Sequence, residues 1–163
     1  MSNLNTATKL DAYVAMEEYI TGEKVQRPWG QYEVTAVGTA NNGEEYCEKE
    51  ITVNPGQILS LQSHDNRREI WTVVQGTLEV ILDGKHHTLQ QGQSINVPLY
   101  AIHCMANRKS NIPCIVHERQ VGVCREEDII RYVDAYGRAT EATGKDVLAS
   151  VDLYNRLRKV INK

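Results

Sequence analysis

Residues 56–76 read GQILSLQSHDNRREIWTVVQG, in which short apolar runs between two glycines are typical of paired β-strands. Side chains two positions apart on a strand point to the same face of the sheet. Gln62 and His64 can therefore reach one interior point, and Glu69 and Trp71 repeat this relation beyond a polar turn. The spacing indicates one binding pocket rather than scattered polar residues.

A second segment with turn signals, residues 92–107, contains His103. We expect it to form another hairpin that brings His103 across to the first three polar side chains. Imidazole, carboxylate and amide groups suit divalent zinc, iron, manganese, nickel or cobalt, and this donor set does not choose among them. The predicted metal ligands are Gln62, His64, Glu69 and His103. For Gln62 the alternative is a hydrogen bond that orients His64.

The two segments resemble the two sequence motifs of the cupins. Gly56–Gly76 is similar to the first motif, with Gln62 in its first histidine position, and Gly92–Asn107 is similar to the second. Within the cupins, the resemblance narrows to the cupin domain of type II mannose-6-phosphate isomerases. The matches span roughly residues 25–138 and include RPWG with Tyr32, Pro55-Gly56, LSLQ at 59–62, His64, Arg67, Glu69, Trp71, Gly76, LDG at 82–84, NIP at 111–113, Glu118, Gln120, Gly122, Arg131 and Asp134-x-Tyr136-Gly137-Arg138.

This resemblance implies an all-β cupin fold, a double-stranded β-helix or jelly-roll barrel. Short N- and C-terminal helices, predicted from apolar spacing, lie outside the resemblance, so the expected division is an N-terminal helical extension over 1–24, the cupin domain over 25–138 and a C-terminal helix over 139–163. The implied reaction interconverts mannose 6-phosphate and fructose 6-phosphate through an enediolate, with a divalent metal ion, zinc first, as cofactor. A sugar phosphate is the implied ligand, and a homodimer the implied assembly. Because no glycine-rich nucleotide loop precedes the cupin region, we do not expect the guanylyltransferase activity of fused relatives.

The chain departs from the family pattern at four positions. Asp65 and Asn66 interrupt a usual run of histidines, Ile70 replaces another histidine, and Tyr100 stands where the second motif has glycine. These departures suit one alternative function, a non-catalytic cupin that binds sugar or metal. A second alternative is a cupin oxygenase that uses ferrous iron, which would share the ligand set and need an apolar substrate cavity.

Glu118 is the candidate catalytic base. Neighbouring residues on a strand face opposite ways, so only one of His117 and Glu118 can line the pocket, and the parity shared with Gln120 favours Glu118. A metal-bound Glu69 would be a poor base, which also favours Glu118 for moving the carbon-bound proton. Lys49 is a further catalytic candidate, for proton transfer or phosphate contact.

Three arginines are candidate ligands of the substrate phosphate. Arg67 lies two positions before Glu69 and shares its face, so it is expected near the metal and is also a catalytic candidate. A guanidinium group holds phosphate with paired hydrogen bonds. Arg131 and Arg138 either close over the pocket or form surface salt bridges, and the sequence leaves both readings open.

Composition and charge exclude several classes of protein. The formal net charge is −3, with 18 basic and 21 acidic residues and no basic block, which argues against a nucleic-acid partner. No apolar run approaches the roughly 20 residues that cross a bilayer, and the first residues lack a signal pattern, so a cytoplasmic protein without a membrane partner is expected. The four cysteines form no close pair, and we expect free, mostly buried thiols.

Helical spacing appears near both ends of the sequence. Apolar residues over Lys9–Tyr19 predict a short amphipathic helix, and those over Asp146–Ile161 predict a second one that ends in basic residues. Short strands broken by turn signals fill Tyr32–Val121, and Glu126–Tyr132 is predicted to be a short helical turn. The terminal helices either dock on the barrel or form a dimer surface.

Overall fold

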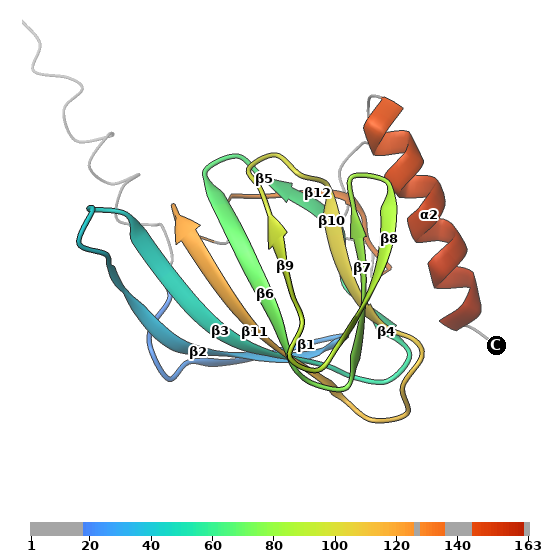
Figure 1. The fold of residues 1–163 in the computed structure, drawn as a ribbon, viewed down its shortest axis with the longest axis horizontal. Coiled ribbons are helices and arrows are strands. Elements are labelled where there is room, and N and C mark those ends of the chain that lie inside the picture. The colour runs from blue at the N-terminus through green and yellow to red at the C-terminus, as the bar shows by residue number, and fades with distance from the viewer. Residues whose placement is uncertain (1–17, 126–127, 136–144, 162–163) are drawn as a thin grey trace, which may run out of the picture.

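The computed structural model describes residues 18–125, 128–135 and 145–161. These residues form mostly β-structure, with one helix towards the C-terminus (Figure 1). The elements in chain order are β1 (Lys24–Arg27), β2 (Gly30–Thr39), β3 (Glu45–Val53), β4 (Gln57–Ile58), β5 (Leu61–His64), β6 (Arg67–Gln75), β7 (Thr77–Leu82), β8 (Lys85–Gln90), β9 (Ser94–Val97), β10 (His103–Asn107), β11 (Cys114–Gly122), β12 (Ile129–Val133) and α2 (Lys145–Ile161).

The strands form two antiparallel sheets that pack against one another (Figure 1). The first sheet has the order β1-β2-β3-β11-β6-β9, and the second has the order β12-β5-β10-β7-β8, with β4 also paired to β10. From β5 onwards the chain repeatedly crosses between the sheets, because β6, β9 and β11 belong to the first while β7, β10 and β12 belong to the second. This alternation is the arrangement of a jelly-roll or cupin barrel, as the sequence predicted.

The alternation of side chains along β6 and β11 divides the interior into two halves. On β6 the buried side chains begin with Arg67 and Glu69 and continue with Trp71 and Val73. Strand β11 follows the same plan, with polar Glu118 and Gln120 towards one end of its buried face and apolar residues towards the other. One half of the barrel is therefore an apolar core, and the other half is lined by buried polar groups.

Helix α2 covers the outer side of the second sheet (Figure 1). Its buried residues Val147, Tyr154 and Leu157 join Leu61 and Cys104 in a second apolar cluster. Full burial of a Val or Leu side chain stabilises a fold by roughly 1.5–3 kcal/mol, so this docking contributes to holding β5 and β10 in place. No helix in the described ranges is long and apolar enough to cross a membrane.

The structure tests the helices that the sequence predicted. The C-terminal helix is confirmed, with bounds Lys145–Ile161. The helical turn predicted over Glu126–Tyr132 is wrong, because Ile129–Val133 is a strand that pairs with β5. Its β-branched residues suit a strand, and the edge of β5 provides hydrogen-bond partners that outweigh the local pattern. The helix predicted over Lys9–Tyr19 lies almost wholly outside the described residues.

Candidate metal centre

Three buried side chains converge inside the barrel. His64 ends β5, Glu69 lies on β6 and His103 begins β10, and their ligand atoms all lie within 4.8 Å of one another. His64 Nε2 is 3.0 Å from Glu69 Oε1, and His103 Nε2 is 3.9 Å from Glu69 Oε2. Small side-chain adjustments would bring all three to one ion at about 2.0–2.2 Å. The structure thus assembles three of the four predicted metal ligands.

Both imidazoles are oriented as metal ligands. The Nδ1 of His103 lies 2.8 Å from the carbonyl oxygen of Ala101, and the Nδ1 of His64 lies 3.3 Å from that of Asp128. A carbonyl only accepts, so Nδ1 carries a proton in each ring and Nε2 faces Glu69. His103 Nε2 has no hydrogen-bond partner, and burial lowers the pKa of His103 to about 4. An unpartnered lone pair on a neutral, buried imidazole fits a bound metal ion.

The backbone around His64 is fixed by two unusual turns. The amide of Tyr100 donates to the carbonyl of His64 at 2.8 Å, and Tyr100 adopts a left-handed conformation with φ of 66°. This is the position at which the sequence departs from a glycine, and the phenol is tolerated because it is 66% exposed. Gly122 has φ of +120°, and a Cβ there would lie 2.3 Å from the carbonyl oxygen of Asn66. Only glycine therefore allows β11 to approach the turn after His64 so closely.

Gln62 lies beside the cluster and lines the adjoining pocket. It pairs directly with His103 in the β5–β10 register, and its Oε1 accepts a hydrogen bond from Ser60 Oγ at 3.0 Å. A carbonyl oxygen has two lone pairs, so this bond leaves one for a metal ion. The prediction that Gln62 is a ligand remains a prediction.

Arg67 is buried next to the cluster, on the face it shares with Glu69, as its parity predicted. Its Nε donates to Glu69 Oε1 at 3.1 Å, one terminal nitrogen lies 3.4 Å from His64 Nε2, and the other donates to the carbonyl of Arg125. A bound metal would replace the Arg67–His64 contact, since that nitrogen has a single lone pair. The guanidinium group, 2% exposed, is engaged with the cluster itself. Its predicted contact with phosphate stays untested.

Glu118 lies inside the pocket while His117 faces outward, so the parity argument is confirmed. Glu118 is 6% exposed, and His117 Nε2 lies 3.5 Å from the carboxylate of Glu48. Gln120 Nε2 donates to Glu118 Oε1 at 2.7 Å, and Trp71 Nε1 donates to its Oε2 at 3.1 Å. Burial, followed by the negative charge of Glu69, raises the pKa of Glu118 to about 7. The role of Trp71 was missed, although it shares the parity of Glu69.

Lys49 is buried in the same pocket, at 4% exposure. It pairs with Glu118 in the β3–β11 register. Its ammonium lies over two aromatic rings, 3.6 Å from the ring centre of Tyr19 and 4.5 Å from that of Tyr32. Such contacts stabilise a cation at a buried site. Neither tyrosine received a site role from the sequence, although Tyr32 belongs to the family match, because both come from segments distant from the cupin motifs.

Two further arginines line the pocket. Arg131, on β12, was predicted, whereas Arg27, at the end of β1, was not singled out. Arg27 lies over the ring of Tyr32, with its guanidinium carbon 5.6 Å from the ring centre. Arg138 lies outside the described residues.

The departures from the family pattern lie away from the pocket. Asp65 and Asn66 are exposed in the turn between β5 and β6, and Ile70 is 40% exposed on the outer face of β6. Asn66 Nδ2 donates to Asp128 Oδ1 at 2.8 Å, and the carbonyl of Asp128 is the partner of His64 Nδ1. Because these residues stand outside the pocket, the absence of the family's histidines here does not change which metal-binding groups line it.

Comparison with known proteins identifies relatives that match nearly three quarters of this chain. The Escherichia coli (strain K12) protein named Mannose-1-phosphate guanylyltransferase is 39% identical over 122 residues, which are 74% of this chain and 24% of that protein. The Pseudomonas aeruginosa protein named Alginate biosynthesis protein AlgA is 41% identical over 119 residues, 72% of this chain and 24% of that protein. The chain thus spans about a quarter of the length of the curated relatives it matches.

A solved structure and a family model agree with the fold described above. The cupin domain of Schizosaccharomyces pombe Cnp3 has a TM-score of 0.50 and 10% identity, covering 61% of this chain and 68% of that chain, and shows the fold alone. Residues 15–134 match the model described as Mannose-6-phosphate isomerase C-terminal. This chain is therefore a cupin that belongs to the mannose-6-phosphate isomerase C-terminal family.

Proposed function

We propose that this chain is a metal-dependent isomerase that interconverts mannose 6-phosphate and fructose 6-phosphate. The position of Glu118 carries the proposal, because this buried carboxyl group lines the same pocket as Glu69 but lies outside the His64–Glu69–His103 cluster. The pocket therefore adjoins a candidate metal site through Glu69 and, separately, contains a candidate base. The choice of sugars rests on the family and on relatives whose names refer to mannose phosphate.

Isomerisation moves one proton between C1 and C2 of the sugar and another between the two attached oxygens. A divalent ion held by His64, Glu69, His103 and Gln62 would supply positive charge to stabilise the negative charge that develops on those oxygens. Glu118 removes the carbon-bound proton and returns it to the neighbouring carbon. A base is most effective when its pKa lies near the working pH, and burial, followed by the negative charge of Glu69, raises the pKa of Glu118 to about 7 in the metal-free protein.

The surroundings of Glu118 suit this task. Trp71 and Gln120 each donate to one of its oxygens, which fixes the carboxylate plane relative to the pocket. The ammonium of Lys49, held over the rings of Tyr19 and Tyr32, can give a proton to a sugar oxygen and recover it. The apolar half of the barrel closes the pocket behind Trp71 and excludes water from that side.

The test is isomerisation by the purified, metal-loaded protein, followed by NMR in deuterated water. We expect conversion of mannose 6-phosphate to fructose 6-phosphate, with deuterium entering C1 or C2 in proportion to exchange with solvent. Glu118→Gln keeps the size and hydrogen bonds of the side chain but removes the base, so kcat should fall by about 10²- to 10⁴-fold.

The matched control is Arg119→Met, which alters a neighbouring side chain that faces outward and pairs with Glu48. It should retain activity. Neither conversion nor deuterium exchange in protein with stoichiometric metal would contradict the proposal and favour a binding cupin. Oxygen consumption by the ferrous form would instead favour an oxygenase.

A further inference from the structure

Gln120 carries an unused hydrogen-bond acceptor in the wall of the pocket. Its side chain lines the pocket and is only 1% exposed. Its Oε1 atom is buried and has no hydrogen-bond partner among the residues that the structure describes. Most buried side-chain oxygens in proteins are hydrogen-bonded, and leaving one without a donor is unfavourable. An acceptor of this kind is suited to a donor that a ligand brings.

The orientation of the Gln120 amide is fixed by its other end. Gln120 Nε2 donates to Glu118 Oε1 at 2.7 Å and to Glu69 Oε1 at 3.5 Å. A flipped amide would place its carbonyl oxygen against these two carboxylate groups, and an ionised carboxylate only accepts. The backbone is fixed as well, because Gln120 pairs with Cys47 on one side of β11 and with Glu69 on the other. Oε1 is therefore held as an acceptor that faces away from the carboxylates.

This acceptor lies close to the proposed base. The nitrogen and oxygen of one amide are about 2.3 Å apart, so Gln120 Oε1 lies within about 5 Å of Glu118 Oε1. In a sugar, a hydroxyl oxygen on the carbon next to the reacting carbon is about 2.4 Å from that carbon. A sugar whose C2 faces Glu118 can therefore place its C3 hydroxyl against Gln120 Oε1. The oxygens on C1 and C2 are the ones assigned to the metal ion, which leaves the C3 hydroxyl as the nearest free donor.

We propose that Gln120 is a specificity-determining residue whose Oε1 accepts a hydrogen bond from the C3 hydroxyl of the sugar. This inference rests on the proposed function for the orientation of the sugar. A site built to hydrogen-bond a hydroxyl group rejects an analogue that lacks it, because the buried acceptor is then left unpaired. One amide thus holds the base at its nitrogen end and selects the substrate at its oxygen end.

The test compares two open-chain ligands by isothermal titration calorimetry of the metal-loaded protein. Mannitol 6-phosphate has no carbonyl group, so it cannot isomerise, and its 3-deoxy analogue lacks only the C3 hydroxyl. Wild-type protein should bind mannitol 6-phosphate roughly 10- to 100-fold more tightly than the analogue. Gln120→Met has a similar length but no amide oxygen, so its two affinities should differ by less than about 3-fold. Comparing two ligands on one protein cancels any general loss of affinity that a substitution causes.

Two further variants separate recognition of the hydroxyl group from positioning of the base. Gln120→Glu keeps an acceptor oxygen, so it should recover the preference for mannitol 6-phosphate, and failure to recover it would contradict the inference. Gln75→Met makes the same change at an exposed glutamine on β6, whose Nε2 donates to the carbonyl of Pro113. This matched control should keep the wild-type preference.

Equal affinity of wild-type protein for the two ligands would overturn the inference whatever the variants do, and so would a lack of binding by either ligand. A preference that persists in Gln120→Met would assign recognition of the hydroxyl group to another residue. If Gln120 only positions Glu118, that variant lowers kcat for mannose 6-phosphate but keeps the preference. The isomerase proposal fails separately. A preference that depends on Gln120, without isomerisation by wild type, would support this inference and contradict only the reaction.

Discussion

Glu69 and Glu118 share one hydrogen-bond donor, the indole N–H of Trp71. Trp71 Nε1 lies 3.0 Å from Glu69 Oε2 and 3.1 Å from Glu118 Oε2. Burial raises the pKa of Glu69, but its contacts with His64, Arg67 and His103 outweigh burial, and the pKa lies well below its ordinary value. The pKa of Glu118 is raised instead. This difference in pKa between two carboxyl groups that share one donor supports the proposed roles of Glu69 as a metal ligand and Glu118 as a base.

Glu118 should make the free energy of unfolding depend on pH. Its pKa rises from 4.5 in the unfolded chain to about 7 in the folded protein, so the folded state holds the proton more tightly. Between these values, stability falls as pH rises, because the unfolded carboxyl group has already ionised and the folded one has not. Above about pH 7 the carboxyl group is ionised in both states, so the stability that its bound proton provided is completely lost. Glu118→Gln should remove this pH dependence, which amounts to a change of roughly 3 kcal/mol in the free energy of unfolding between the two pKa values.

The measurement is urea unfolding of metal-free wild type and Glu118→Gln at several pH values between 4.5 and 8. The free energy of unfolding of the variant should rise relative to wild type as pH increases. A difference that stays constant, or that falls with pH, would show that Glu118 does not carry a raised pKa in the folded protein.

Metal binding should require both imidazoles of the cluster. His64→Ala combined with His103→Ala removes two of the three buried ligands, and the remaining carboxylate cannot hold an ion at stoichiometric occupancy. Elemental analysis after dialysis should find about one equivalent of divalent metal in wild type and almost none in the double variant. His117→Ala, on the outer face, is the matched control and should retain the metal. Equal metal content in wild type and double variant would place the ion elsewhere.

The sequence was sufficient for the parts of the site that lie on single strands. The two-residue period of β6 places Arg67, Glu69 and Trp71 on one buried face, and the same rule places Glu118 inside and His117 outside. These predictions hold because the barrel interior is buried along the whole of β6 and β11. A shift by one residue would expose every apolar side chain on the strand.

Contacts between distant segments were not predictable from local patterns. Arg27 reaches the pocket because β1 joins the edge of the first sheet, which depends on the order of strands and not on any spacing. Tyr19 precedes β1 and contacts Lys49. The pattern over Glu126–Tyr132 predicts a helical turn, because it is short and the pairing of Ile129–Val133 with β5 cannot be seen in the sequence. Local propensity is a weak guide where a sheet edge offers hydrogen bonds.

All four cysteines should be inert to thiol reagents in the folded protein. Each is a buried free thiol, and burial raises the pKa of Cys47 to about 12 and the pKa of Cys114 and Cys124 to about 11. Burial also raises the pKa of Cys104. The thiolate is the reactive form of cysteine, and at pH 8 these raised pKa values leave almost none of it. Titration with Ellman's reagent should detect almost no thiols in native protein and four in urea without reductant. Fewer than four in urea would reveal a disulfide.

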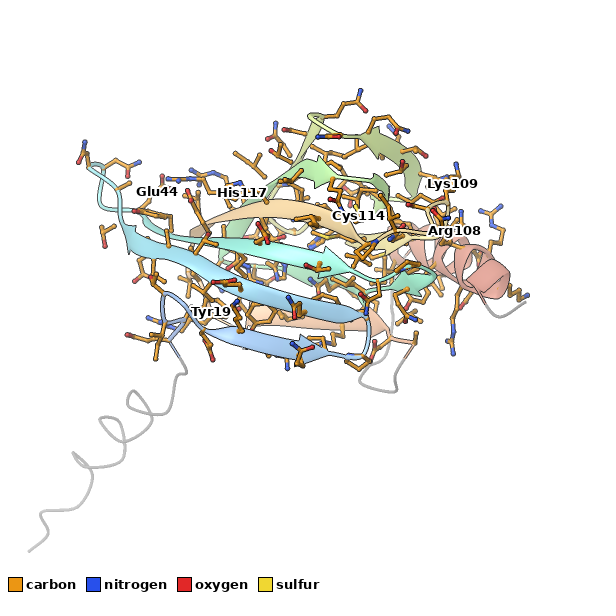
Figure 2. The ribbon with its side chains drawn as sticks, turned by 90° about the horizontal axis from the view of Figure 1, so that it is seen from below. Tyr19, Glu44, Arg108, Lys109, Cys114 and His117 are labelled. Carbon is orange, nitrogen blue, oxygen red and sulfur yellow. The ribbon has the colours of Figure 1, made fainter. Side chains whose placement is uncertain are left out.

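A buried ion pair beneath α2 provides the last prediction. Glu79, on β7, has a side chain with 0% exposure, and Arg108 donates from Nε to its Oε2 at 2.8 Å. Arg108 also donates to the carbonyl of Leu157 in α2, and Figure 2 shows Arg108 beside this helix. Burial raises the pKa of Glu79, but the hydrogen bonds and charge of Arg108 outweigh it, so the pKa lies below its ordinary value. The ion pair therefore links α2 to the second sheet.

Arg108→Met should lower the free energy of unfolding by about 3 kcal/mol at pH 7, because it leaves the Glu79 carboxylate buried without its main partner. The depressed pKa of Glu79 means that the stabilisation exists above the unfolded pKa and disappears as pH falls through the folded value. Urea unfolding at pH 7 and pH 3 should thus show a smaller difference between variant and wild type at pH 3.

Lys109→Met is the control, since Lys109 Nζ is 3.9 Å from Glu79 and 55% exposed, and it should lower the free energy of unfolding by less than about 1 kcal/mol. In the double variant Glu79→Gln with Arg108→Met, neutral groups replace both charges, so the loss should be smaller than for Arg108→Met alone. A larger loss in the double variant would mean that Arg108 acts mainly through packing against α2.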